Sequence, residues 1–156
     1  MTTNASSAQP NSPAASLPLP YGAPITLAMA KQVMAAAESA CLERGWPMVI
    51  AIFDSTGHLV VLHRCDQAQL GSVAIAQAKA ETAVNFRRPT KDFQDVIAAG
   101  GIGLRLLAAP GMLPMEGGLP LIADGHVIGA IGVSGMQSSQ DAEIARIGVA
   151  ALGTAR

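Results

Sequence analysis

The fold is decided by the stretch LPLIADGHVIGAIGVSG, residues 119–135. Two apolar runs, Leu119–Ala123 and Val127–Val133, flank the dipeptide Asp124-Gly125. An Asp-Gly pair between two such runs is a strong local signal for a β-hairpin, because both residues tolerate the positive φ that tight hairpin turns require. The stretch therefore predicts two antiparallel strands joined by a short turn.

A second hairpin is predicted upstream by the same reasoning. Met48–Phe53 and Leu59–His63 are apolar runs, and the turn-forming residues Asp54-Ser55-Thr56-Gly57 separate them. Both hairpin turns place an acidic residue, a glycine and a histidine together, which we interpret as turn chemistry rather than as an internal repeat.

Helical patterns surround the two hairpins. An apolar stripe at spacings of three and four follows the potential N-cap Thr26, and Gly45 with Pro47 ends it. Its members are Leu27, Ala30, Met34, Ala37 and Cys41.

Three further helices are predicted. The alanine-rich segment Ser72–Phe86 is stopped by Pro89, and Thr90 opens a short helix over Thr90–Ala98 that ends at Gly100-Gly101. Ser138 and Asp141 form a capping signature before a final helix over Ala142–Leu152. Gly103–Ala109 fits no single element, and Pro110–Pro120 is too rich in Pro and Gly to be regular structure.

These patterns give the element order α-β-β-α-α-loop-β-β-α. Two hairpins separated by helices imply an α/β protein of the α+β kind, in which helices cover a mainly antiparallel sheet. We place one domain at residues 25–156. Residues 1–24 are rich in Ser, Pro, Ala and Asn, and that composition predicts a disordered or loosely docked arm.

Composition limits the partners of this chain. It has 156 residues, of which 50% are hydrophobic and only 3% aromatic, so a single core of small aliphatic side chains is expected. With a net charge of −1 and 13% charged residues, the chain lacks the basic stripe of a nucleic-acid-binding protein. So few charges also oppose self-association only weakly. We therefore expect a homo-oligomer and no nucleic-acid partner.

The same features indicate a cytoplasmic location. No apolar run approaches the roughly 20 residues that cross a membrane, so no membrane partner is expected. The N-terminal segment lacks the basic and apolar regions of a secretory signal. Cys41 and Cys65 fit neither a disulfide framework nor a zinc site, and we expect two reduced thiols.

The loop before the second hairpin carries the strongest candidate site. Gly117 and Gly118 offer backbone N–H groups without side-chain obstruction, so they could cradle a carboxylate; the alternative is a tight turn that needs positive φ. A Pro-rich loop of this length in a compact domain is usually functional. Glu116, next to them, could act as a general acid or base if partly buried, or could be a solvated carboxylate.

Other candidates come from the first hairpin and the second helix. Arg64 could clamp a ligand carboxylate or form a structural ion pair with Asp66. His63 and Cys65 share the opposite strand face, and either could ligate haem iron, although a lone strand histidine more often lies at an edge. Lys79 could neutralise an anion or could extend to the surface.

The glycines of the second hairpin have a structural interpretation. Gly129, Gly132 and Gly135 lie within and after a strand, so they do not form a dinucleotide-binding fingerprint, and close packing against a helix or a neighbouring subunit explains them better. Gly135 could still leave the N-terminus of the last helix open to an anion. The sequence contains no P-loop, no Ser-His-Asp order and no metal triad.

Several segments together resemble the GlcG/HbpS family, also described as the haem-degrading domain or DUF336. The similar segments are Asp54–Leu59 with Arg64-Cys65-Asp66, Ala78–Ala83, Glu116–Pro120, Gly125–Gly135, and Asp141 with Ile144 and Ala145. They occur in the family's order over about residues 25–152, which makes the combination specific. Cys65 departs from the family pattern, which usually has Met there.

The resemblance implies a sheet-and-helix sandwich that assembles into dimers or octamers. It also implies a ligand site that includes Thr82, from the family's K-A-x-T-A helix, together with the Gly-Gly loop. Family members include haem-binding proteins, a domain fused to corrinoid adenosyltransferases, and proteins encoded beside catabolic enzymes.

The residues and the resemblance therefore indicate two alternative functions. One is a small-ligand-binding protein with haem or another tetrapyrrole as the leading ligand. The other is a cofactor-free catabolic hydrolase, tautomerase or deaminase acting on a small carboxylated intermediate. In the second, Arg64, Lys79 and Glu116 would provide the anion clamp and the proton-transfer group.

Overall fold

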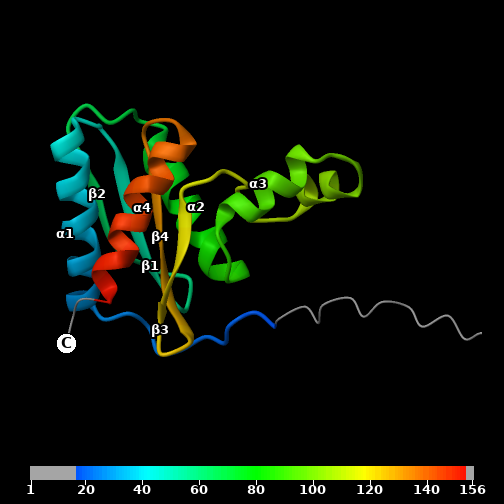
Figure 1. Ribbon diagram of the computed structural model, residues 1–156, viewed down its shortest axis with the longest axis horizontal. Coiled ribbons are helices and arrows are strands. Elements are labelled where there is room, and N and C mark those ends of the chain that lie inside the picture. The colour runs from blue at the N-terminus through cyan, green and yellow to red at the C-terminus, as the bar shows by residue number, and fades with distance from the viewer. Residues whose placement is uncertain (1–16, 154–156) are drawn as a thin grey trace, which may run out of the picture.

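The computed structural model describes residues 17–153. Four strands form one antiparallel sheet in the order β2-β1-β4-β3 (Figure 1). The strands are β1 (Val49–Asp54), β2 (Leu59–Arg64), β3 (Gly118–Ala123) and β4 (His126–Ser134). Both predicted hairpins and the α+β class are confirmed, and β1 pairs with β4 to join the hairpins into a single sheet.

Helices cover both faces of this sheet. Helices α1 (Leu27–Arg44) and α4 (Ser138–Leu152) pack side by side on one face, and α2 (Ser72–Phe86) covers the other. Strand β1 shows why, because Ile50 and Ile52 belong to the core under α1 and α4, whereas Val49 and Ala51 belong to the core under α2. Successive side chains of a strand point to opposite faces, so a continuous apolar run serves both layers.

Small residues bring α2 close to the sheet. A Cβ atom on Gly132 of β4 would lie 2.5 Å from the backbone nitrogen of Ala80 and would overlap the carbonyl of Ala76. The expectation that this glycine serves close packing against a helix is confirmed. Close packing here places the α2 residue Lys79 directly behind β3 and β4.

Two smaller elements project from the body. Helix α3 (Thr90–Ala98) is followed by the 3₁₀ helix η1 (Gly101–Ala108), which occupies the segment that the sequence left ambiguous. Figure 1 shows α3 and the following turn extending away from the sheet. The loop after η1 is shorter than predicted, because β3 already begins at Gly118.

The predicted helix starts were right for α1 and α3 and wrong for α4. Thr26 caps α1 through its side chain, which accepts a hydrogen bond from the backbone N–H of Met29. Helix α4 is instead capped reciprocally by Gln137 and Gln140, because the carboxylate of Asp141 is engaged elsewhere. Helix α3 begins at Thr90, as predicted.

The described part of the N-terminal segment runs along the sheet. Tyr21 forms a parallel bridge with Val127 of β4, and its hydroxyl donates to the carbonyl of Val84, 2.8 Å away, at the end of α2. The carbonyl of Pro20 accepts from the backbone N–H of Val127. Residues 1–16, which make up most of the predicted arm, lie outside the described residues. Within residues 17–153 no helix is long and apolar enough to cross a membrane.

Candidate functional site

The turn at Glu116 and Gly117 is fixed from two sides. On one side, α3 holds it, because the side-chain oxygen of Gln94 accepts from the N–H of Glu116 and the hydroxyl of Thr90 accepts from the N–H of Gly118. On the other side, the carbonyl of Gly117 accepts from the N–H of Val133 in β4. The backbone of the turn therefore keeps one geometry without belonging to a helix.

The two glycines are needed for different reasons. Gly117 has a φ of 125°, a conformation that other residues rarely adopt. Gly118 lies at the start of β3, where a Cβ atom would meet Thr90 Cγ2 at 2.6 Å and would overlap the backbone of Lys79. The missing Cβ of Gly118 therefore allows packing against α2 and α3, and a Gly118→Val variant would test folding before it tested ligand binding.

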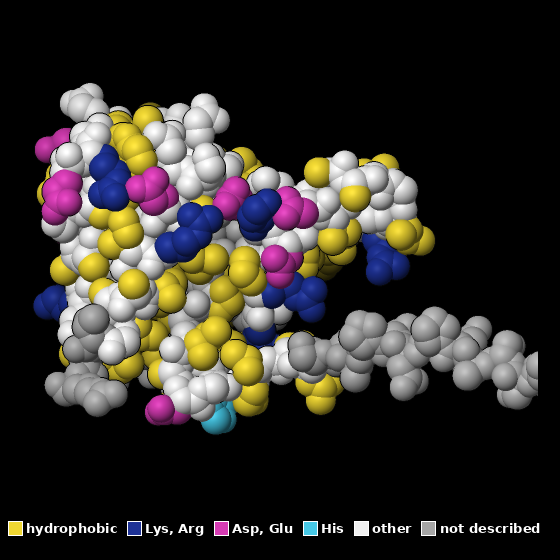
Figure 2. Space-filling view, viewed as in Figure 1, with side chains coloured by type: hydrophobic (Ala, Val, Ile, Leu, Met, Phe, Trp, Pro, Cys, Tyr) yellow, Lys and Arg dark blue, Asp and Glu magenta, His cyan; other side chains and the backbone are white. Residues whose placement is uncertain are grey.

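A cavity of about 220 Å³ opens beside this turn, and we call it the Glu116 pocket. Its wall joins Glu116–Gly118 to the start of α3 and to α4, and it is lined by Pro89, Lys91, Asp92, Glu116, Gly117, Gly118, Leu119, Ala142 and Arg146. Figure 2 shows basic and acidic side chains alternating across this face, from α4 toward α3. The pocket thus offers charged groups of both signs.

Glu116 is held inside this pocket by Arg146. Its carboxylate lies 3.3 Å from the Arg146 guanidinium, and only 12% of the Glu116 side chain is exposed, against 60% for Arg146. A guanidinium has five N–H donors, and Arg146 uses one of them here. Lys91, on the opposite wall, pairs with Asp95 at 2.7 Å. Arg146 therefore retains donors that a ligand could accept from.

A buried ion pair lies directly behind the turn. Lys79 Nζ contacts Asp141 Oδ2 at 2.7 Å and donates to the carbonyl of Val133 at 3.0 Å. Asp141 also accepts from the backbone N–H of Met136. A Cβ on Gly117 would lie 2.8 Å from Lys79 Nζ, so the pair supports the turn from within the core.

Burial acts on both members of this pair. It is the largest influence on each, lowering the pKa of the Lys79 ammonium below its ordinary value and raising the pKa of the Asp141 carboxyl. The short contact between them opposes both shifts. Lys79 is only 1% exposed, so its amine is already engaged and serves the site by positioning the turn.

The remaining predicted residues lie away from the Glu116 pocket. Arg64 ends β2, at the opposite edge of the sheet from β3, and it is exposed. Thr82 contacts the loop before the turn, accepting from the N–H of Leu113 at 2.8 Å. Gly135 packs against Pro47 and Met48. The structure therefore brings Glu116, Gly117, Gly118 and Lys79 together and does not bring Arg64 to them. Gly135 is connected to them only through Asp141, whose carboxylate accepts a hydrogen bond from the Gly135 backbone.

The residues of the first hairpin have separate environments. His63 Nδ1 lies 3.1 Å from Glu38 of α1. Cys65 contacts the core near Cys41, where burial is the main cause that raises the pKa of the Cys41 thiol to about 12. Within residues 17–153, Arg64 and Asp66 form no ion pair with each other.

Four residues of the site were missed at the sequence level: Lys91, Gln94, Asp141 and Arg146. Asp141 was noticed as a capping residue and as part of the family resemblance, but not as a member of the site, and the other three are ordinary polar positions on two helices far apart in the chain. Their shared property is that they approach one turn in space, and a single sequence carries no signal for such an approach.

Both the sequence and the fold match a known protein family. The model of the HbpS-like family, described as haem-degrading proteins, matches residues 25–150. The chain is 37% identical over 106 residues to the protein GlcG of Escherichia coli strain K12. The aligned residues make up 68% of this chain and 78% of GlcG.

Two solved structures extend the similarity to the whole fold. A double mutant of HbpS from Streptomyces reticuli superposes with a TM-score of 0.78 at 30% identity, covering 97% of this chain and 99% of that one. A complex of PduOC with haem superposes with a TM-score of 0.75 at 32% identity, covering 82% of this chain and 94% of that one. The family resemblance inferred from the sequence is confirmed: the chain belongs to the HbpS-like family.

Proposed function

We propose that this protein binds a small organic ligand that carries carboxylate groups, with haem or another tetrapyrrole as the leading ligand. The ligand's carboxylate would occupy the Glu116 pocket, between Lys91 and Arg146. The observation that carries the proposal is the Arg146 guanidinium, which lines a cavity of about 220 Å³ with most of its donors unused.

Two further facts support this assignment. A relative that is 32% identical has been crystallised with haem, and haem carries two propionate carboxylates. The pocket also has a rigid wall, because Gln94, Thr90 and Val133 fix the backbone of residues 116–118. A fixed wall lowers the entropy that binding must offset.

Titration of the purified chain with hemin tests the proposal. We expect a Soret band that shifts on binding and saturates at a fixed ratio of hemin to protein. A Soret change that grows in proportion to added hemin, without saturation, would mean non-specific adsorption and would refute tetrapyrrole binding.

A second candidate function is favoured by the placement of Glu116. Its carboxylate is largely buried in the wall of the pocket and is paired with an exposed guanidinium, which is an arrangement that could move a proton to or from a bound carboxylated substrate. This is the cofactor-free catabolic enzyme, namely a hydrolase, tautomerase or deaminase.

Glu116→Gln separates the two candidates, because it keeps the shape of the side chain and removes its charge. If Glu116 transfers a proton, turnover of phenylpyruvate or of a p-nitrophenyl ester should fall by roughly 100-fold or more in the variant. If the protein is only a binder, no turnover by the parent chain will be found, and hemin affinity will change little.

A further inference from the structure

We propose that the cavity between α3 and η1 is a second ligand subsite, and that it takes the flat apolar body of a carboxylated tetrapyrrole. This inference rests on the proposed function and deepens it. The Glu116 pocket would then hold one end of the ligand, and the cavity between α3 and η1 the rest.

The cavity has a volume of about 400 Å³. Its apolar lining comes from Phe93 and Val96 of α3 and from Ile102 and Leu106 of η1. Gly103 brings the two elements together, since a Cβ there would lie 2.9 Å from Val96 Cγ1. The two short elements therefore form the walls of one apolar recess.

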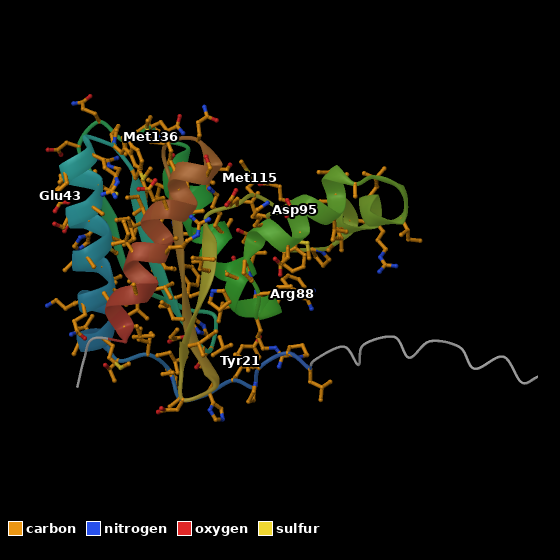
Figure 3. All side chains as sticks on the ribbon, in the orientation of Figure 1. Tyr21, Glu43, Arg88, Asp95, Met115 and Met136 are labelled. Atoms are coloured by element: carbon orange, nitrogen blue, oxygen red, sulfur yellow. The ribbon has the colours of Figure 1, made fainter. Side chains whose placement is uncertain are left out.

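Two arginines stand at this recess. Arg88, labelled in Figure 3, precedes α3 and lies over the ring of Phe93, with its guanidinium carbon 5.6 Å from the ring centroid. Arg105 approaches from η1. Within residues 17–153 neither guanidinium forms an ion pair. Two unpaired guanidinium groups beside an apolar surface suit a planar ring that carries carboxylates, because guanidinium both pairs with carboxylate and stacks on aromatic faces.

The recess and the Glu116 pocket adjoin each other. Asp92 lines both, and Lys91 lies next to it on the wall of the Glu116 pocket. Sites for drug-sized ligands and cofactors span roughly 300–1,000 Å³, so a pocket of about 220 Å³ is too small for a tetrapyrrole. A ligand of that size has to extend beyond it, and the recess between α3 and η1 is the adjoining space.

Exposed apolar surface at the recess supports an apolar occupant. Ile102 is 81% exposed and Val96 is 46% exposed. Large apolar side chains that are exposed together on a projecting element usually mark a binding surface. The unpaired arginines favour an anionic aromatic ligand over a second copy of this chain. Coverage by a second copy is therefore an outcome that the experiment must be able to detect.

The experiment compares Arg88→Gln and Arg105→Gln with Arg64→Gln in the full chain. Arg64 is the matched control, because it is exposed and lies at the opposite edge of the sheet. Each variant is titrated with hemin and with protoporphyrin IX dimethyl ester, whose carboxylates are blocked. Circular dichroism verifies folding, and light scattering gives the oligomeric state.

We expect the Kd for hemin to rise roughly tenfold in each of the first two variants, as the loss of a charge-assisted hydrogen bond implies, and to stay unchanged in Arg64→Gln. The parent chain should bind the dimethyl ester more weakly than hemin, with a larger Kd. That Kd should not change in Arg88→Gln or Arg105→Gln.

Three results would overturn the inference, and they have different consequences. Parent affinity for hemin in both variants refutes the subsite and leaves the proposed function standing. A change in oligomeric state without a change in Kd assigns the recess to a subunit interface instead. Failure of the parent chain to bind hemin removes the inference together with tetrapyrrole binding.

Discussion

At the scale of single residues, Lys79 shows how the sequence and the site are connected. A lysine in an alanine-rich helix can extend to the surface or reach into the protein, and Lys79 is 1% exposed with Asp141 as its partner. A buried ammonium requires such a partner, because an isolated charge in the core costs several kcal/mol. The pair is what places the last helix against the Gly117 turn.

Lys79→Met should therefore destabilise the protein strongly. It leaves the Asp141 carboxylate buried without its partner, and breaking a buried pair from one side typically costs about 3–5 kcal/mol. Urea unfolding measures the loss, with the exposed Lys31→Met as the control. A loss no larger than that of Lys31→Met would show that the pair does not support the fold.

The turn of the first hairpin should make stability depend on acid pH. Partial burial tends to raise the pKa of the Asp54 carboxyl, but hydrogen bonds from Thr56 and from the N–H of His58 outweigh burial and hold the pKa below its ordinary value. Folding thus favours the ionised form, so its stabilisation is full above the unfolded pKa of about 4 and is lost as the pH falls through the folded pKa.

The parent chain should accordingly be more stable than Asp54→Asn by about 1 kcal/mol at pH 6–7. This advantage should shrink below about pH 4 in urea unfolding at a series of pH values. An advantage that is constant from pH 7 to pH 3 would contradict the assignment of the effect to the ionised carboxylate.

At the scale of elements, the sequence predicted most of the fold and only part of the site. The segments Ser72–Phe86 and Thr90–Ala98 are helices with the predicted bounds, since alanine content and a following proline or glycine pair are local signals. The predicted cap of α4 was wrong, because Asp141 pairs instead with Lys79, which is 62 residues away in the chain. Likewise, Arg146 and Lys91 belong to the Glu116 pocket through tertiary packing alone.

The loop that carries Glu116 should loosen when its contact with α2 is removed. Thr82→Val deletes the hydroxyl that accepts from the N–H of Leu113 at 2.8 Å in a partly buried contact, and such a hydrogen bond contributes about 0.5–1.5 kcal/mol to stability. We expect faster hydrogen exchange at Leu113 and its neighbours, with exchange in β1 unchanged. Parent-like exchange at Leu113 would mean that the loop is held by other contacts.

At the scale of the whole molecule, the part of η1 that does not line the recess favours self-association. Large apolar side chains on it are exposed, among them Leu104 at 49% and Leu107 at 66%, and the low overall charge opposes association only weakly. We predict a stable dimer or larger homo-oligomer, to be measured by light scattering at micromolar concentration.

The double variant Leu104→Ser, Leu107→Ser should shift this mass toward the monomer, because it removes apolar area that association would bury. Leu42→Ser is the matched control, since Leu42 on α1 is 68% exposed and lies outside η1. A parent chain that is already monomeric, or a double variant with the parent's mass, would contradict the prediction.

The central claim is that Lys91 and Arg146 bind the carboxylate of the ligand in the Glu116 pocket. The most direct test is hemin titration of the double variant Lys91→Gln, Arg146→Gln beside the control Lys31→Gln, Arg64→Gln, which removes equal charge elsewhere. Loss of two charge-assisted hydrogen bonds should weaken binding by roughly 10- to 100-fold in the first variant and leave the control near the parent value. Equal affinity in both double variants, with saturable binding by the parent, would show that the carboxylate binds elsewhere and that the Glu116 pocket is not the ligand site.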